Sequence, residues 1–260
     1  MIKLRITSTT NLINFLKRLK NVDRSVLLEL TSDSMFCKVH TPDKSVMKFS
    51  SLTFGEVFEG EIEWKSVLKK GTTDERVKIG IIEVGKVIDC FKHFRPEEDV
   101  FLEIETDVLE GSCVATQIKL ISNSLYINLR CADLSLLSYV EDNILDMVHS
   151  KEDTIAQFKI YQSDFSSIIS LCGLESNSEE LLNFVVTAKE VRAKGESFNY
   201  KISIAKEEIR VSEDSVNSPI YKSQISYMEA ETCDCYLHEN RLVLFSQQSN
   251  TSIAIGVVIK

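Results

Sequence analysis

The feature that most limits the fold of this chain is an apolar pattern that occurs once near its start and again past its middle. In the segment STTNLINFLKRLKN (8–21), the apolar residues have the spacing of one buried helical face: Leu12, Phe15, Leu16 and Leu19. The segment SDFSSIISLCGL (163–174) repeats this spacing 153 residues later, with Phe165, Ile168, Ile169 and Cys172. A strand-like alternating segment precedes each helix, at 2–6 and at 155–161. The sequence therefore predicts two copies of one structural unit.

Most of the remaining chain has the short alternating runs that are typical of strands. In the first half we expect strands at 25–33, 34–41, 45–54, 61–67, 77–82, 99–106, 112–122 and 125–131, with a loop at 69–73. In the second half we expect them at 179–188, 191–194, 198–205, 209–211, 220–228, 233–237, 241–246 and 252–259. The predicted fold class is α+β, with two similar domains of antiparallel sheet, at 1–131 and 154–260.

A second helix is predicted only in the first domain. The segment 83–94 has the helical apolar spacing again, and it must end before Pro96 because a residue before proline is pushed out of the helical region. The buried positions are Val84, Val87, Ile88 and Phe91. In the second domain the only stretch available for a matching helix is 226–234, which allows about one to two turns.

Residues 132–153, ADLSLLSYVEDNILDMVHSKED, have neither the helical nor the strand period. They mix apolar residues with acidic ones, so we interpret them as a connector that lies over the surface between the two domains. The alternative is a third helix that packs into the core.

The distribution of charge is more informative than its sum. The chain has 30 basic and 39 acidic residues, a net charge of −9, which argues against a protein that is coated in nucleic acid or lies on an anionic membrane. The acidic residues lie mainly outside the first helix, which has none, for example at 59–63, 97–107 and 141–146. A local basic surface is therefore still expected.

The sequence carries no signature of export, membrane insertion, metal binding or catalysis. No apolar run approaches the about 20 residues that span a bilayer, and the N-terminus lacks a signal core, so we expect an intracellular protein. The 7 Cys fit reduced thiols, and Cys233 and Cys235 lack a second pair of metal ligands. No P-loop, Rossmann, nucleophile-elbow or zincin motif occurs. We therefore expect no enzyme, no cofactor and no metal, although an active site without a recognisable motif stays an alternative.

The duplicated order of strands and helices resembles the DNA sliding clamp superfamily, of the type of proliferating cell nuclear antigen and the T-even phage polymerase clamp. The resemblance covers nearly the whole chain and is clearest in four segments: TNLINFLKRL (10–19), EVGKVIDCFKHFRPEEDVFLEIE (83–105), FKIYQSDFSSIISL (158–171) and LLNFVVTAKEVRAKGESFNYKISI (181–204). It implies a DNA polymerase processivity factor for replication and repair, which forms a homotrimeric ring around duplex DNA without reading its sequence. The edge strands that join subunits would be 125–131 and 198–205.

The resemblance also implies functional residues. Those expected to face DNA are Lys17, Arg18, Lys20, Lys86, Lys92 and His93. A DNA polymerase and a clamp loader would insert short peptide motifs into a groove at the connector, which would be lined by Met35, Cys37, Val46, Leu136, Leu137, Tyr139, Val140 and Val258. Such a clamp would work in the nucleus, or in the cytoplasm or host cell of a bacterial or viral source. Two alternatives stay open: a monomeric clamp-like viral processivity subunit that binds DNA directly, and an unrelated α+β binding protein.

Overall fold

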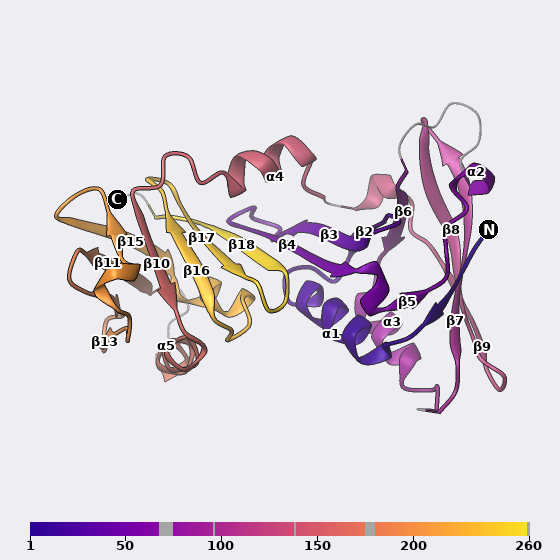
Figure 1. Ribbon diagram of the computed structural model, residues 1–260, viewed down its shortest axis with the longest axis horizontal. Helices are drawn as coiled ribbons and strands as arrows, with labels where there is room; N and C mark the ends of the chain where they lie inside the picture. The colour runs from indigo at the N-terminus through magenta and orange to yellow at the C-terminus, as the bar shows by residue number, and fades with distance from the viewer. Residues whose placement is uncertain (68–74, 96, 138, 175–179, 259–260) are drawn as a thin grey trace. The chain divides into compact units, whose positions relative to one another are not determined.

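The computed structural model describes residues 1–67, 75–95, 97–137, 139–174 and 180–258 of the chain (Figure 1). The chain divides into two compact units, unit 1 with residues 1–39 and 49–139, and unit 2 with residues 40–48 and 140–260. The boundary at 139–140 falls inside the predicted connector. A hairpin tip from the first half, residues 40–48, belongs to unit 2. The predicted loop 69–73 lies outside the described residues.

Unit 1 contains one sheet, two helices that contact each other, α1 and α3, and the four-residue helix α2. Its elements in chain order are β1 (Ile2–Ile6), α1 (Thr9–Lys20), β2 (Val26–Leu30), β3 (Ser34–His40), β4 (Val46–Thr53), η1 (Phe54–Glu56), β5 (Phe58–Glu59), α2 (Trp64–Val67), β6 (Val77–Ile81), α3 (Val84–Phe91), β7 (Val100–Leu109), β8 (Ser112–Ile121), β9 (Tyr126–Arg130) and η2 (Leu134–Leu136). The strand order is β3-β2-β6-β8-β7-β1-β5, and β9 pairs with β8 beside this path. All these pairs are antiparallel except β6 with β8.

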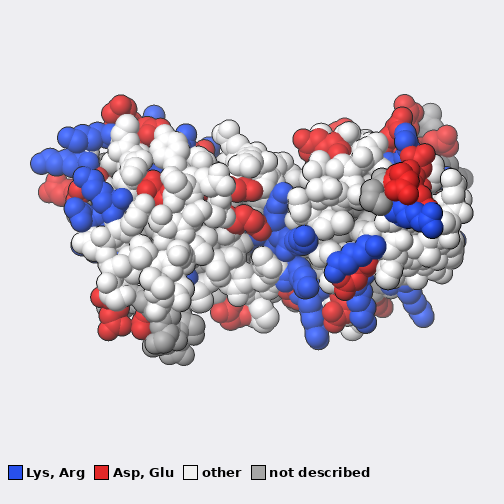
Figure 2. Space-filling model, turned by 90° about the horizontal axis from the view of Figure 1, so that it is seen from below, with Lys and Arg blue, Asp and Glu red and all other residues white. Residues whose placement is uncertain are grey.

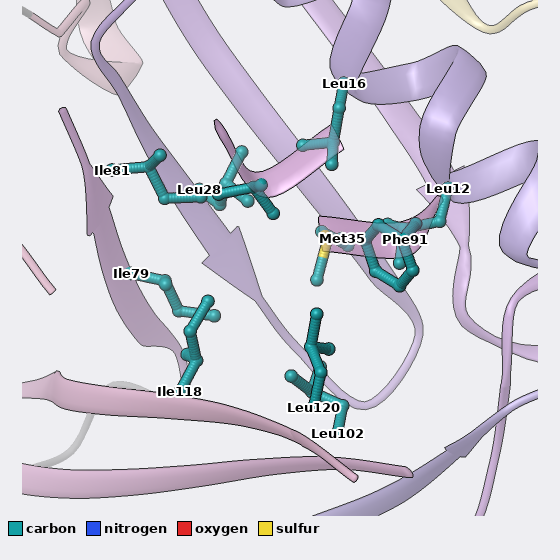
Figure 3. A pocket seen from close by; sticks show the side chains of 11 residues that line it. Leu12, Leu16, Leu28, Met35, Ile79, Ile81, Phe91, Leu102, Ile118 and Leu120 are labelled. Atoms are coloured by element: carbon teal, nitrogen blue, oxygen red, sulfur yellow. The ribbon is translucent and has the colours of Figure 1, made fainter. Parts of the chain in front are cut away.

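Helices α1 and α3 cover one face of this sheet because both turn their apolar residues toward it. Ser8 begins α1, and its Oγ accepts a hydrogen bond from the backbone N–H of Asn11 at 3.2 Å. Between the helices and the sheet lies a cavity of about 30 Å³, into which the apolar side chains of α1, α3 and five strands point (Figure 3). A space of this size with an apolar lining is a packing gap in the core and too small for an organic ligand.

Unit 2 contains two sheets and the helix that matches α1. Its elements are α4 (Asp142–His149), β10 (Ala156–Ile160), α5 (Gln162–Leu174), β11 (Leu181–Thr187), β12 (Val191–Lys194), β13 (Asn199–Lys201), η3 (Lys206–Glu208), β14 (Arg210–Val211), β15 (Ser215–Tyr221), η4 (Lys222–Tyr227), β16 (Cys233–Leu237), β17 (Arg241–Ser246) and β18 (Thr251–Gly256). One sheet has the order β14-β10-β16-β17-β18, and the other β13-β12-β11-β15. The hairpin tip joins β18, because Gly256 donates its N–H to the Ser45 carbonyl at 2.9 Å.

The two units repeat the same pairing scheme. In unit 1, β1 pairs with β5 and β7, β2 with β3 and β6, and β8 with β7 and β9. In unit 2 the corresponding pairs are β10 with β14 and β16, β11 with β12 and β15, and β17 with β16 and β18. Phe15 of α1 and its counterpart Ile168 of α5 are both fully buried. The prediction of a duplicated α+β unit is thereby confirmed.

Two predicted strands are wrong because the backbone forms local hydrogen bonds instead. In the segment 61–67, Val67 donates its N–H to the Glu63 carbonyl at 3.2 Å, and α2 forms. In the segment 220–228, β15 ends at Tyr221, whose N–H donates to Oε1 of Gln224 at 2.9 Å and so begins η4. This six-residue 3₁₀ helix stands between β15 and β16, where α3 stands between β6 and β7. The second helix of unit 2 is therefore reduced, and it begins four residues before the predicted stretch 226–234, which it overlaps at residues 226–227.

The connector contains a helix, α4, which lies on unit 2. Ile144 and Val148 pack against Tyr236, Val243 and Ala254. These positions alternate along their strands with the core residues Cys235, Leu242 and Leu244, so α4 covers the sheet face opposite the core. The segment thus includes a helix, which packs on the outer face of a sheet and not into the core. The role of residues 132–153 as a connector between two domains stays a prediction.

Candidate nucleic-acid interface

Helices α1 and α3 contact each other. All six residues predicted to face DNA lie on these helices or directly after α3, and five of the six are exposed. Lys17 and Lys20 of α1 are exposed, while Arg18 is half-buried. Lys86 lies on α3, and Lys92 and His93 follow its last residue, all three exposed. Figure 2 shows Lys and Arg side chains gathered over the part of unit 1 that these helices form.

The sequence produces this face by simple periodicity. In α1 the four buried residues fall on one side, so Asn11, Asn14, Lys17 and Lys20 are left exposed on the other. The helix has no acidic residue in its first turn and three basic ones, Lys17, Arg18 and Lys20, in its last. Cations at a helix C-terminus interact favourably with the helix dipole, by about 0.3–1 kcal/mol each when they are exposed.

Asp89 of α3 partly neutralises the basic face. Its Oδ1 lies 2.6 Å from Nζ of Lys92, and both side chains are mostly exposed. The hydrogen bond from Lys92 lowers the pKa of Asp89, and the charges of Lys92, Lys20 and His93 add to this effect. The structure thus brings Lys20, Lys92 and His93 together around one carboxylate. The contact of all six residues with DNA stays a prediction.

The matching helix of unit 2, α5, presents a neutral face. Its exposed residues include Gln162, Ser163, Ser166 and Ser170, and it has no Lys or Arg. Its only carboxylate, Asp164, is buried and accepts hydrogen bonds from the Tyr200 hydroxyl at 2.7 Å and the Ser203 backbone N–H at 3.2 Å. The two units therefore share a fold but differ in the charge of their corresponding helices.

Each unit has an edge strand with unpaired backbone groups. Among the described residues, β9 pairs only with β8 and β13 only with β12. These are the strands predicted for the subunit edges, at 125–131 and 198–205, although β13 spans only Asn199–Lys201. Beside β9 is a hollow of about 260 Å³, which Ile82, Leu129 and Cys131 help to line. Ile82 leaves 48% of its surface exposed there.

The residues predicted for the peptide groove do not lie on one surface. Met35 lines the core cavity under α1 and α3, and Cys37 is fully buried, with the pKa of its thiol raised by burial. Leu137 instead packs with Leu27 and Ala132. Leu27 alternates with Leu28, which pairs with Cys37, so Leu137 lies on the opposite sheet face from Met35 and Cys37. The strand pattern gives two faces but does not show which one the helices cover.

Of the remaining predicted groove residues, only two are open to solvent. Leu136 and Tyr139 are 70% and 49% exposed in unit 1. In unit 2, Val46 and Val140 are buried, while Val258 is half-buried and donates its N–H to the Pro219 carbonyl at 2.8 Å. The sequence prediction missed Met147 of α4, which is 64% exposed. The sequence pattern gives no signal for this, because Ile144, Met147 and Val148 have the i, i+3, i+4 spacing of one helical face, which predicts that Met147 is buried.

The described residues offer no candidate for a metal centre. No group of three or more His, Cys, Asp or Glu side chains among them is arranged to hold a metal ion. Cys233 is buried, and desolvation raises its pKa to about 12, so the thiolate that a metal would need is disfavoured. None of the helices within the described ranges combines the length and apolar character that crossing a lipid bilayer requires.

Comparison with solved structures identifies similar folds over the full chain. The PCNA of A. fulgidus, in a complex with the C-terminal region of FEN-1, matches with a TM-score of 0.67 at 14% identity and covers 100% of this chain and 99% of its own. The PCNA2–PCNA3 complex of Sulfolobus tokodaii matches with a TM-score of 0.67 at 13% identity, and the match covers 98% of this chain and 99% of the other. The PCNA of Thermococcus kodakaraensis matches with 0.65 at 9% identity, over 99% of both chains. No protein-family model and no curated protein matches the sequence.

Proposed function

Because the chain has the fold of the DNA sliding clamp superfamily, we propose that it acts as a DNA polymerase processivity factor. Such a protein performs no chemistry. It closes into a ring around duplex DNA and tethers the polymerase and other replication proteins to their template.

The basic face of α1 and α3 carries this proposal. In a chain with a net charge of −9, Lys17, Lys20 and Lys86 are exposed on two contacting helices. Exposed lysines attract phosphates by a screened interaction that depends on salt and carries no sequence information. Contacts of this kind do not fix the DNA in one register, so they permit sliding. The acidic remainder of the surface disfavours binding of DNA elsewhere.

The edge strands support assembly into a ring. A heterologous interface joins two different surfaces of one subunit, and repeated copies close into a ring when the rotation fits. The unpaired edges of β9 in unit 1 and β13 in unit 2 are two such surfaces, since an exposed strand edge is a template for pairing with another chain. We propose that β9 of one subunit pairs with β13 of the next in a homotrimer.

The charge difference between α1 and α5 implies an uneven ring. If both helices line the hole, each subunit contributes one basic sector from unit 1 and one neutral sector from unit 2. A trimeric ring then attracts DNA strongly through three basic sectors, and not through six. Serine hydroxyls on α5 can still donate hydrogen bonds to phosphate oxygens, but they add little long-range attraction.

The partners proposed for the outer surface are proteins with short peptide motifs. In the A. fulgidus complex, PCNA binds the C-terminal region of FEN-1. In this chain, Leu136 and Tyr139 are large apolar residues exposed at the connector. Exposed apolar residues that gather in one place mark interaction sites on soluble proteins. A polymerase or a clamp loader is the kind of partner we propose for them.

Retention on DNA of two topologies tests the proposal. The protein would be loaded on a nicked circular plasmid, with a loader or by mass action, and passed over a sizing column before and after linearisation. A ring stays with the circle and leaves the linear DNA through its ends. Light scattering would show a mass three times the 29.5 kDa of one chain. Equal retention on both DNA forms would exclude encirclement.

A second candidate is a clamp-like monomer that binds DNA directly. The observation that favours it is the neutral face of α5, since a monomer needs only the one basic face that unit 1 provides. This candidate predicts a mass of 29.5 kDa in solution and binding that does not depend on DNA ends.

A further inference from the structure

Asp164 is the buried carboxylate of α5, with 3% of the residue exposed. It lies in the first turn of the helix, and each of its oxygens accepts a hydrogen bond from the segment that contains β13. Oδ1 accepts from the Tyr200 hydroxyl at 2.7 Å, and Oδ2 accepts from the Ser203 backbone N–H at 3.2 Å. One side chain of α5 therefore holds both the strand β13 and the residues that follow it.

The strand β13 has few hydrogen bonds of its own. Its three residues pair with β12 on one side, and within the described residues no strand pairs with it on the other. Ile202, which follows it, donates its N–H to the Val191 carbonyl at 3.0 Å. Segments with few backbone hydrogen bonds and contacts open locally more easily than the core of a sheet. The two bonds to Asp164 therefore add fixed points to a strand that is otherwise weakly held.

These bonds lie on the inner face of the sheet and leave the edge of β13 open. Tyr200 is opposite Ala193 of β12, which is fully buried, and its side chain packs against the core of unit 2. Asn199 and Lys201, the neighbours of Tyr200 in the strand, are exposed because side chains alternate between the two faces. The free backbone groups of the edge point along the sheet, so they stay available to another chain.

We propose that Asp164 positions β13 for pairing with a second copy of this chain. The inference rests on the proposed function, in which β9 of one subunit pairs with β13 of the next. A strand that is already held in one geometry loses less conformational entropy on association than a mobile strand, so the interface is tighter. Asp164 is buried and acts through Tyr200 and Ser203. If α5 lines the hole of the ring, the same contact links the DNA side of unit 2 to its subunit edge.

Dissociation of the trimer on dilution, followed by light scattering, tests the inference in the full chain. The variant Y200F keeps the aromatic ring and loses only the hydroxyl that donates to Asp164. Since a hydrogen bond to a charged group is typically worth a factor of about ten or more, Y200F should dissociate at a concentration about tenfold higher than the natural protein does. The double variant D164N/Y200F should assemble no more weakly than D164N alone, because both changes remove the same bond.

The matched control is Y161F. It removes another tyrosine hydroxyl of unit 2, which donates to the Glu208 carboxylate at 3.0 Å and does not contact β13, so the trimer should dissociate as in the natural protein.

Hydrogen exchange separates positioning from a general loss of stability. In Y200F the backbone amides of residues 199–203 should exchange about tenfold faster, while those of β11, an inner strand of the same sheet, keep their rate. A natural protein that is a monomer would overturn the proposed ring, and this inference with it. A natural trimer that dissociates at the same concentration in Y200F, or an equal acceleration of exchange in β11 and β13, would overturn this inference alone.

Discussion

Lys20 of α1 lies directly over Gly85 of α3. A Cβ atom added to Gly85 would stand 3.3 Å from Nζ and 3.4 Å from Cε of Lys20. The glycine therefore lets the end of the lysine side chain cross the neighbouring helix within the proposed DNA-binding face.

The variant G85A should be slightly more stable than the natural protein. Alanine favours a helix over glycine by up to about 1 kcal/mol, and the side chain it meets is the flexible end of a lysine that can move aside. We expect its free energy of unfolding, measured in urea, to rise by about 0.5 kcal/mol, and its retention on circular DNA to stay the same. In G80A, by contrast, the new Cβ would stand 2.7 Å from the backbone oxygen of Ala132. The free energy of unfolding of that variant should be lower by about 1–3 kcal/mol, which is the typical cost of overpacking a core site.

Reversal of charge on α1 should weaken retention on circular DNA without affecting folding or assembly. In K17E/K20E, two exposed attractive charges per subunit become repulsive. We expect retention to fall at least about tenfold at moderate salt. The slope of the logarithm of the binding constant against the logarithm of the salt concentration should become shallower by roughly one for each lost phosphate contact. The matched control is K189E/K206E, which reverses two exposed lysines of unit 2, one in the β11–β12 turn and one in η3. A similar loss in the control would point to net charge as the cause.

How much of this could be predicted from the sequence depends on how local each feature is. The helical spacing of Leu12, Phe15 and Leu16 gave α1, its buried face and its exposed basic face, because all three follow from one period. The duplication followed from the same spacing in α5. The neutral face of α5 could also be read directly from its serines.

Features that depend on distant partners could not be predicted in this way. Residues 222–227 form η4 and not a strand, and there Nζ of Lys222 lies 2.8 Å from Oε2 of Glu180, a residue far away in sequence. The sequence predicts Met35 in the peptide groove, whereas it lines the core cavity, because alternation in β3 defines two faces without showing which one α1 and α3 cover. His238 carries no sequence pattern, and only its burial in the sheet makes it notable.

The side chain of Lys48 should be essential to the stability of unit 2. It is completely buried in the hairpin strand β4 and donates to the Tyr227 carbonyl at 2.7 Å and to the Glu229 carboxylate at 3.3 Å. Removing one partner of a buried ion pair typically costs about 3–5 kcal/mol, so K48A should unfold at a clearly lower urea concentration. The variant K48M keeps most of the side-chain volume of Lys48, so its free energy of unfolding should decrease less than that of K48A. If K48A has the stability of the natural protein, the hairpin tip contributes little to unit 2.

Stability should decrease in mildly acidic solution because of His238. Burial lowers its pKa below 6.5 in the folded state, so the unfolded chain binds a proton at a higher pH than the folded chain does. The contribution of this group is complete above pH 6.5 and is lost as the pH falls from there toward the lower folded pKa. Urea unfolding at pH 7.5 and at pH 5.5 would measure the loss. The H238F variant should show a smaller decrease over this range, and an equal decrease would assign the effect to other groups.

Assembly into a ring should depend on Ile82, beside the free edge of β9. Its side chain is 48% exposed next to the hollow of about 260 Å³, so a second subunit that pairs with β9 would bury it. An interfacial aspartate without a basic partner would have to lose its hydration, which weakens association by several kcal/mol. We therefore expect I82D to shift the mass measured by light scattering from a trimer to a monomer. L109D introduces the same charge at an exposed leucine at the end of β7 and should leave the trimer intact. A trimer that survives I82D would place the subunit contact elsewhere, whereas loss of the trimer in both variants would indicate general destabilisation of unit 1.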